Sequence, residues 1–375
     1  HGAGEIHVNE KRSGVFVDIN NEIDYSIINP SKLSHEIQFD ICRRCHLQGT
    51  SVLQNGKNWN DFIPGTILSE TMDTYIPRYE NDESFIMASH VDRLQQSDCF
   101  KVGGISCISC HNPHKSVTTL DNNYFNNKCL SCHTNCEEPL NNIECVSCHM
   151  PKSSSSDILH VSITDHNISV HSNSKEVKGS FKELICINND SPTNLSKAKA
   201  YSKHYESFAQ NPILLDSAFM FLKRCGKEES FPFYIQYYYL INDYKSLITY
   251  HESIRSSLNV RLFTENILSL TYCRIAEAYH HLDIYEKSYQ FYLKSINLSP
   301  NNLDFLLKTS VLEIKMSKFE QSKIRLKKII KLNPNFDKAY YNLGLIYLNV
   351  DKDLDIAKLN FEETLKLNPD YIQAK

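Results

Sequence analysis

Cys107-Ile108-Ser109-Cys110-His111 is one of four stretches in which two cysteines, separated by two residues, are followed at once by a histidine. The other three are Cys42-Arg43-Arg44-Cys45-His46, Cys129-Leu130-Ser131-Cys132-His133 and Cys145-Val146-Ser147-Cys148-His149. With 13 cysteines and 16 histidines in 375 residues, chance would produce about 0.02 copies of this pattern. The four copies, which all lie between residues 42 and 149, therefore decide how the first half of the chain folds.

This spacing is the attachment signature of c-type haem. The two thiols bond to the two vinyl groups of one macrocycle, and the next histidine binds the iron from the proximal side. We therefore predict at least four haem c groups, attached through Cys42, Cys45, Cys107, Cys110, Cys129, Cys132, Cys145 and Cys148 and ligated by His46, His111, His133 and His149. The alternative is zinc, but the usual zinc-site spacing, in which one such cysteine pair is matched by a second pair of ligands, is not followed.

The sixth ligand of each iron must come from elsewhere in the chain. Histidine is more plentiful than methionine here, so we predict bis-histidine ligation, which implies lower reduction potentials than histidine with methionine. His90 is expected on a helix, and His114 is too close to His111 to reach the opposite face of the same haem, so it would serve a neighbouring one. The candidates are His7, His90, His114, His160 and His166, with His35 and His171 as alternatives.

Composition and charge argue against a nucleic-acid-binding or membrane protein. A net charge of −4 and a pI near 6.5 give no sign of binding to nucleic acid or to an anionic membrane. No run of 18 apolar residues is present, so we predict no membrane span.

Cys99 and Cys136, which lie outside the motifs, could form a disulfide or remain two separate buried thiols. Cys186, Cys225 and Cys273 are predicted to be small core residues.

The chain is predicted to be mainly α, with different architectures in its two halves. Residues 1–170 carry the motifs and few apolar runs, which predicts a haem-packed multihaem domain of short helices and loops with little regular sheet. The polar stretch 171–194 is predicted to be a linker. Residues 195–267 have helical periodicity and are interpreted as degenerate helical pairs, and residues 268–375 as an α-solenoid of tetratricopeptide repeats.

The repeat assignment rests on evenly spaced prolines. Pro300 and Pro334 are 34 residues apart, which is the length of a tetratricopeptide repeat, and Pro369 follows after 35. Counting back from Pro369, the small residue Gly344 falls where the two helices of a repeat approach closely, and Ala276 has the same place in an earlier repeat. We expect the extra residue in the turn at 350–353, and the last repeat is predicted to be truncated.

Several further segments make the chain resemble the secreted multihaem c-type cytochromes that carry C-terminal tetratricopeptide repeats. They are His1-Gly2-Ala3-Gly4-Glu5-Ile6-His7, Ala88-Ser89-His90-Val91, Cys110-His111-Asn112-Pro113-His114, Cys148-His149-Met150-Pro151 and His160-Val161-Ser162-Ile163-Thr164-Asp165-His166. The resemblance implies that His1 ligates a further haem whose cysteines precede residue 1. It also implies bis-histidine irons and a periplasmic or extracellular location in a bacterium.

Two functions remain open at this point. In the first, the haems carry electrons and the repeats bind a redox partner protein or other copies of the chain. In the second, the protein reduces a nitrogen oxide or a sulfur oxyanion at one open haem, with Arg78, Tyr79, Arg93 and Lys101 as candidates for holding the anion. No motif has lysine in place of its histidine, a feature of some nitrite-reducing haems, so the sequence favours an electron carrier over a catalyst. A structural role for the haems is compatible with the first function.

Overall fold

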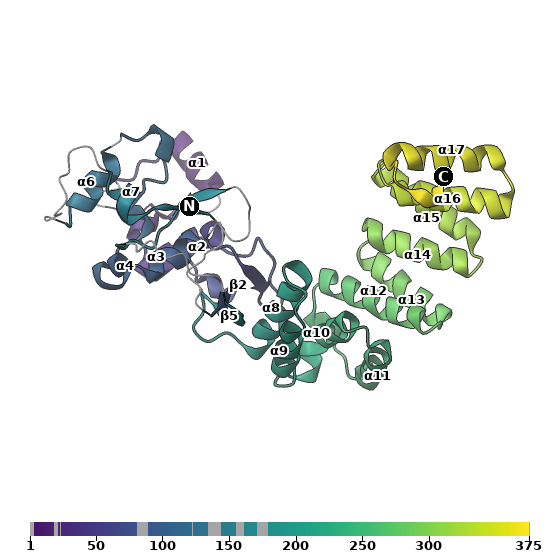
Figure 1. Ribbon diagram of the computed structural model, residues 1–375. Coiled ribbons are helices and arrows are strands. Elements are labelled where there is room, and N and C mark those ends of the chain that lie inside the picture. Colours follow the sequence, from purple (N-terminus) through teal and green to yellow (C-terminus); the bar gives the residue numbers. More distant parts are fainter. Residues whose placement is uncertain are drawn as a thin grey trace. The chain divides into compact units, whose positions relative to one another are not determined.

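The computed structural model describes residues 4–18, 22, 24–80, 89–121, 123–133, 144–154, 161–170 and 179–374. The chain divides into two units, His1–Ala209 and Gln210–Lys375. Helices predominate in the described residues of both units, as the sequence predicts (Figure 1). Within the described part of the chain, each helix is too short or too polar to cross a membrane.

A three-stranded antiparallel sheet forms the core of the first unit. Its strands are β1 (Thr50–Leu53), β2 (Met72–Tyr79) and β5 (Phe181–Cys186), in the order β1-β2-β5. Helix α8 (Asn194–Ser207) packs beside β1, and the Tyr75 hydroxyl of β2 donates to Ser196 Oγ of α8 at 2.9 Å. Ser196 Oγ in turn donates to the buried Asp73 carboxylate at 2.5 Å. Hydrogen bonds therefore join the sheet to α8.

Strand β5 shows that the prediction of a linker over residues 171–194 is wrong for Phe181–Cys186. These residues pair with β2, with Tyr75 opposite Cys186 and Tyr79 opposite Phe181. The predicted group of degenerate helical pairs at 195–267 is also divided, because α8 belongs to the first unit and the following helices to the second. Only Leu184 of β5 is buried, so the strand gives little hydrophobic signal in the sequence.

The rest of the first unit consists mainly of short helices, as predicted for the motif-bearing region. A second, two-stranded sheet pairs β3 (Lys152–Ser154) with β4 (Ser162–Thr164). The described helices are α1 (Glu5–Arg12), η1 (Pro30–Lys32), α2 (His35–His46), η2 (Leu68–Glu70), α3 (His90–Gln96), α4 (Asp98–Gly103), α5 (Cys107–Cys110), η3 (Val117–Thr119), α6 (Tyr124–Leu130) and α7 (Cys145–His149).

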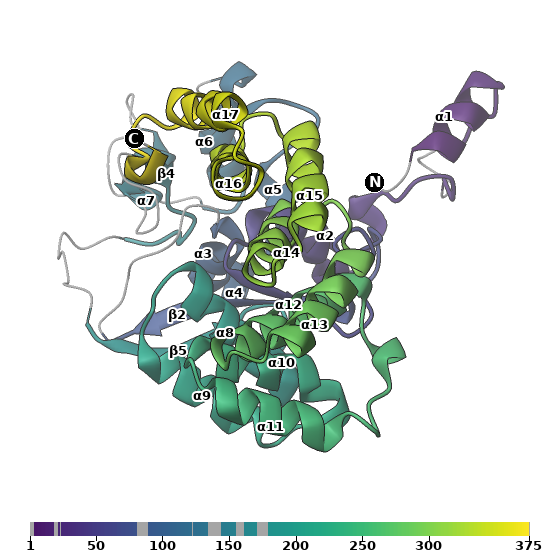
Figure 2. The same ribbon diagram turned by 90° about the vertical axis from the view of Figure 1, so that its right-hand side faces the viewer.

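The second unit is a series of antiparallel helix pairs, which lie one after another (Figures 1 and 2). The helix pairs expected from the 34-residue period are present, and a further pair, α10 with α11, precedes them. The elements are α9 (Pro212–Leu222), α10 (Lys227–Leu240), α11 (Tyr244–Ile254), η4 (Val260–Leu262), α12 (Glu265–His281), α13 (Tyr285–Leu298), α14 (Leu303–Lys315), α15 (Phe319–Leu332), α16 (Asp337–Ile346), the π-helical turn η5 (Tyr347–Asp351), α17 (Leu354–Leu367) and η6 (Ile372–Ala374).

The turns between the two helices of each pair share one backbone feature. One residue in each turn is left-handed, with φ near 58°, and the four are Asn242, Asp283, Ser317 and Lys352. In the first turn, the N–H of Asp243 then bonds to the carbonyl of Tyr238 at 2.9 Å, a common way to end a helix. In the last turn, η5 absorbs the one extra residue that the proline spacing revealed.

Small residues let the paired helices approach closely. Ser288 Oγ donates to the carbonyl of Ala276 at 2.8 Å, and Ser322 Oγ donates to the carbonyl of Ser310 at 3.0 Å, 34 residues later. All four residues are fully buried. In the last pair Gly344 takes the place of Ala276 and Ser310, and a Cβ built on it would lie 2.7 Å from the Phe361 ring of α17.

We expect Gly344→Ala to lower the free energy of unfolding of the second unit by about 1–3 kcal/mol, because the added methyl overpacks the contact with Phe361. Urea unfolding of the full chain, followed by hydrogen exchange in peptides from α16 and α17, would measure the loss. In a double-mutant cycle, Phe361→Leu should recover part of it. If the effects of Gly344→Ala and Phe361→Leu on the free energy of unfolding are strictly additive, contact with Phe361 does not cause the loss.

Candidate functional site

Each of the four cysteine motifs lies on, or at the end of, a short helix. The first motif closes α2, the second forms α5 and the residue after it, and the fourth forms α7. The third begins in α6 and ends in the turn that follows. Because residues three apart lie on one face of a helix, the two thiols of a motif point to the same side. The local structure thus presents paired thiols with a histidine directly after them.

The first cysteines of the motifs lie next to one another in pairs. The thiols of Cys42 and Cys107 are hydrogen-bonded, which lowers the pKa of Cys42 to about 7 and raises the pKa of Cys107. Burial, together with the neighbouring Cys145 thiol, raises the pKa of Cys129 to about 11. The first motif is therefore adjacent to the second, and the third to the fourth.

Four histidines from separate segments form a row of neighbouring rings. The ring centres of His46 and His90 are 5.6 Å apart, those of His90 and His166 are 4.7 Å apart, and those of His166 and His111 are 6.2 Å apart. Two of these residues belong to the motifs and two were predicted as sixth ligands. Burial lowers the pKa of His90 and of His111, and it lowers the pKa of His166 to about 4. Burial therefore favours the neutral form of His90, His111 and His166 near pH 7, and a neutral ring keeps a lone pair for a metal.

Hydrogen bonds orient two of the candidate ligands. His166 Nδ1 lies 3.0 Å from the carbonyl oxygen of Thr164, and His149 Nδ1 lies 3.2 Å from that of Ser169. A ring that donates from Nδ1 to a carbonyl leaves Nε2 for a metal, which is the usual arrangement at metal-bound histidines. His90 Nδ1 is buried and has no hydrogen-bond partner within the described residues.

Other candidates lie apart from this row of rings. His7 Nδ1 lies 2.9 Å from Ser26 Oγ and 3.3 Å from the Asp24 carboxylate. His35 Nε2 lies 3.0 Å from the carbonyl of Ile105, so its usual metal-binding nitrogen is already engaged. His114 and His133 are exposed. Four residues named in the sequence predictions lie outside the described part of the chain, namely His1, His160, His171 and Cys136.

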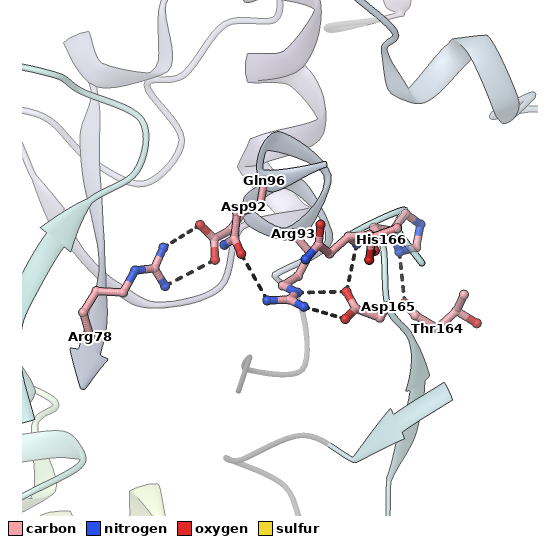
Figure 3. Close-up of polar contacts among 9 residues, drawn as sticks. Arg78, Asp92, Arg93, Gln96, Thr164, Asp165 and His166 are labelled. Atoms are coloured by element: carbon pink, nitrogen blue, oxygen red, sulfur yellow. Dashed lines mark hydrogen bonds and ion pairs between the residues drawn. The ribbon is translucent and has the colours of Figure 1, made fainter. Parts of the chain in front are cut away.

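Two ion pairs beside the histidines were not predicted from the sequence. Arg93 donates to both carboxylate oxygens of Asp165, at 2.8 and 2.6 Å, and Arg78 donates to those of Asp92, at 2.8 and 3.4 Å (Figure 3). The prediction that Arg78 and Arg93 could hold an oxyanion is thus not supported by their surroundings, because both guanidinium groups already bind carboxylates. Tyr79, a third candidate, packs its ring against Phe181.

The donor set suits haem, as judged by the separations of the rings. Two imidazoles that bind one iron from opposite faces, with metal–nitrogen bonds of about 2 Å, have ring centres about 6 Å apart. The separations of His46 from His90 and of His111 from His166 match this spacing. Within the described residues, no group of three or more histidine, cysteine or acidic side chains is arranged to hold a bare metal ion.

Comparisons with known proteins bear on the second unit. Family models of the tetratricopeptide repeat match residues 270–302 and 326–358. No curated protein matches the chain. Among solved structures, a MamA protein is 17% identical, with a TM-score of 0.38, over 48% of this chain and 94% of its own. The first TPR domain of human RPAP3 is 22% identical, with a TM-score of 0.27, over 28% of this chain and 84% of that domain. The Arabidopsis OM64 TPR domain is 19% identical, with a TM-score of 0.28, over 29% of this chain and 90% of that domain. The family models therefore identify tetratricopeptide repeats in the second unit of this chain.

Proposed function

We propose that this chain is a multihaem c-type cytochrome that carries electrons through at least four haems, and that its tetratricopeptide repeats bind a protein partner. The observation that supports this most directly is the row of rings, in which two motif histidines each face a second histidine at 5.6 and 6.2 Å. The exported location implied by the family resemblance belongs to the same proposal.

In this proposal each side chain has a defined part. His46 and His90 hold one iron, and His111 and His166 hold another, while the motif cysteines anchor the macrocycles. His133 and His149 hold the remaining two irons, with His114 and His160 as the candidates for their sixth ligands. Haem supplies reversible one-electron chemistry when it is bound.

The chain's own residues would favour electron transfer over catalysis. Two histidines on an iron would leave no position for a substrate, and burial favours the neutral form of His90, His111 and His166. The adjacency of the first motif to the second, and of the third to the fourth, would place the haems close enough for electrons to pass between them. The alternative function is an oxidoreductase with one open haem, for which His133 is the ligand to examine, because it is exposed and no second histidine ring lies against it within the described residues.

The first test is the haem content of the purified holoprotein and its reaction with carbon monoxide. We expect four haems per chain, and no change in the visible spectrum when carbon monoxide is added to the dithionite-reduced protein. A shift in about one quarter of the haem would instead support the oxidoreductase. Absence of covalent haem would overturn both functions.

A cysteine variant tests the attachment sites. Cys107→Ser with Cys110→Ser should lower the haem content from four to three per chain, because both thioether bonds to one macrocycle are lost. The pyridine haemochrome spectrum and the intact mass measure this loss. Cys225→Ser, outside the motifs, is the matched control and should keep all four haems. An unchanged content in the double variant would exclude attachment at this motif.

A further inference from the structure

The ion pair between Arg93 and Asp165 is buried and has two-pronged geometry. The two side chains are 8% and 5% exposed, and two parallel hydrogen bonds join them. Asp165 Oδ1 also accepts the backbone N–H of Asn167 at 2.9 Å, and Arg93 also donates to Gln96 at 3.1 Å. Such two-pronged pairing fixes both the distance and the relative orientation of the segments that carry the partners.

Those segments carry two of the candidate iron ligands. Arg93 lies one helical turn after His90 on α3, and residues three apart share a helix face. Asp165 directly precedes His166, whose Nδ1 lies 3.0 Å from the carbonyl oxygen of Thr164 (Figure 3). The His90 and His166 rings are 4.7 Å apart. The ion pair and the two rings therefore join α3 to the same short stretch after β4.

Helix α3 is held from a second direction as well. Asp92, the neighbour of Arg93, accepts two hydrogen bonds from Arg78 of β2 (Figure 3). Arg78 is 27% exposed, so this pair is more open to solvent than the one between Arg93 and Asp165. The Arg78 pair ties the helix to the sheet, whereas the Arg93 pair ties it to the segment of His166. Only the second of these directly sets the spacing of the two histidines.

We propose that Arg93 and Asp165 are positioning residues for two iron ligands, and that their ion pair holds His90 and His166 so that each binds its own haem iron. This inference rests on the proposed function, because it requires haem at the first two motifs. Loss of the pair would leave a buried charge without its partner and would free the stretch that carries His166. One or both irons would then lose the sixth ligand.

The test uses the holoprotein with Asp165→Asn, which keeps the shape of the side chain and removes its charge. We expect the wild-type haem content, together with a carbon monoxide-reactive fraction that rises by one quarter to one half of the total haem. Added imidazole should restore the six-coordinate spectrum, and an unchanged far-ultraviolet circular dichroism spectrum would exclude a general loss of structure. Arg78→Gln, which breaks the other ion pair, is the matched control and should bind no more carbon monoxide than the wild type.

Arg93→Lys provides a second variant, because it keeps the charge but cannot form the two parallel hydrogen bonds. It should also raise the carbon monoxide-reactive fraction, and it decides the question if Asp165→Asn does not fold. Full haem content with a wild-type response to carbon monoxide in the variants would overturn the inference and leave the proposed function intact. A wild-type protein without covalent haem would instead overturn the proposed function itself.

Discussion

Replacing Arg325 by alanine should lower the free energy of unfolding of the second unit by about 3–5 kcal/mol. Its guanidinium binds the Glu313 carboxylate through Nε at 2.9 and 3.0 Å and through a terminal nitrogen at 2.9 Å. Glu313 is fully buried and also accepts from the Tyr289 hydroxyl at 3.0 Å. Without Arg325 a buried carboxylate would remain with one hydroxyl donor among the described residues, and the cost of burying that charge would no longer be offset.

Urea unfolding of the full chain, read by hydrogen exchange in peptides from α14 and α15, would measure this effect in the second unit alone. Lys323→Ala is the matched control on the same helix, since its partners Glu320 and Asp351 are more exposed, and it should cost no more than about 1 kcal/mol. Leucine at both Glu313 and Arg325 should restore most of the stability, because no charge is then buried. Equal losses for Arg325→Ala and Lys323→Ala would contradict the prediction.

Acid should weaken the second unit through His251. This residue of α11 is 4% exposed, and neither of its ring nitrogens has a hydrogen-bond partner within the described residues. It lies between the rings of Phe231 and Phe291, and burial lowers its pKa to about 4. In the unfolded chain the pKa is about 6.5. Between these values the unfolded chain binds a proton that the folded chain does not.

The free energy of unfolding should therefore fall as the pH drops from about 6.5 to about 4, by up to about 3 kcal/mol, and this contribution should change no further below pH 4. The charged groups around the ring shift the pKa of His251 in both directions. Glu252 raises it by favouring the protonated form, and Arg255, Lys287 and Lys294 lower it.

A leucine at position 251 removes the titrating group and keeps an apolar side chain among the same rings. The difference between wild type and His251→Leu, measured by hydrogen exchange in peptides from α11 across this pH range, isolates the histidine. Profiles that stay parallel from pH 7 to 4 would show that His251 does not cause the acid sensitivity.

The repeats of the second unit could be predicted because their signals are local. The even spacing of the prolines and the small residues at Ala276 and Gly344 are readable within one stretch of about 34 residues, and they mark helix pairs that contact their neighbours. Strand β5 could not be predicted, because its partner β2 ends at Tyr79, far away in the sequence. Its burial pattern also has a single buried position, so it lacks the alternation that marks a strand.

At the candidate site, too, local patterns could be predicted from the sequence and contacts between distant residues could not. The cysteine motifs and His90, at the start of a helix, follow from short patterns, and the structure brings His90 and His166 to the motif histidines His46 and His111. The pairing of Arg93 with Asp165 joins residues 72 positions apart, and nothing in either neighbourhood indicates the other. From the sequence, Arg93 was instead a candidate for holding an anion, because a buried partner at that distance leaves no local pattern.

The pairing of β2 with β5 also bears on how such chains can change over evolution. Tyr79 lies opposite Phe181, so the intervening residues 80–180, with three of the four motifs, form an insertion between two adjacent strands. Each doubling in the length of a flexible loop costs only about 0.6 kcal/mol of closure entropy. Motifs can therefore be gained or lost within the insertion while β1, β2, β5 and α8 keep their pairing. The number of motifs and the fold of the scaffold can be inherited separately.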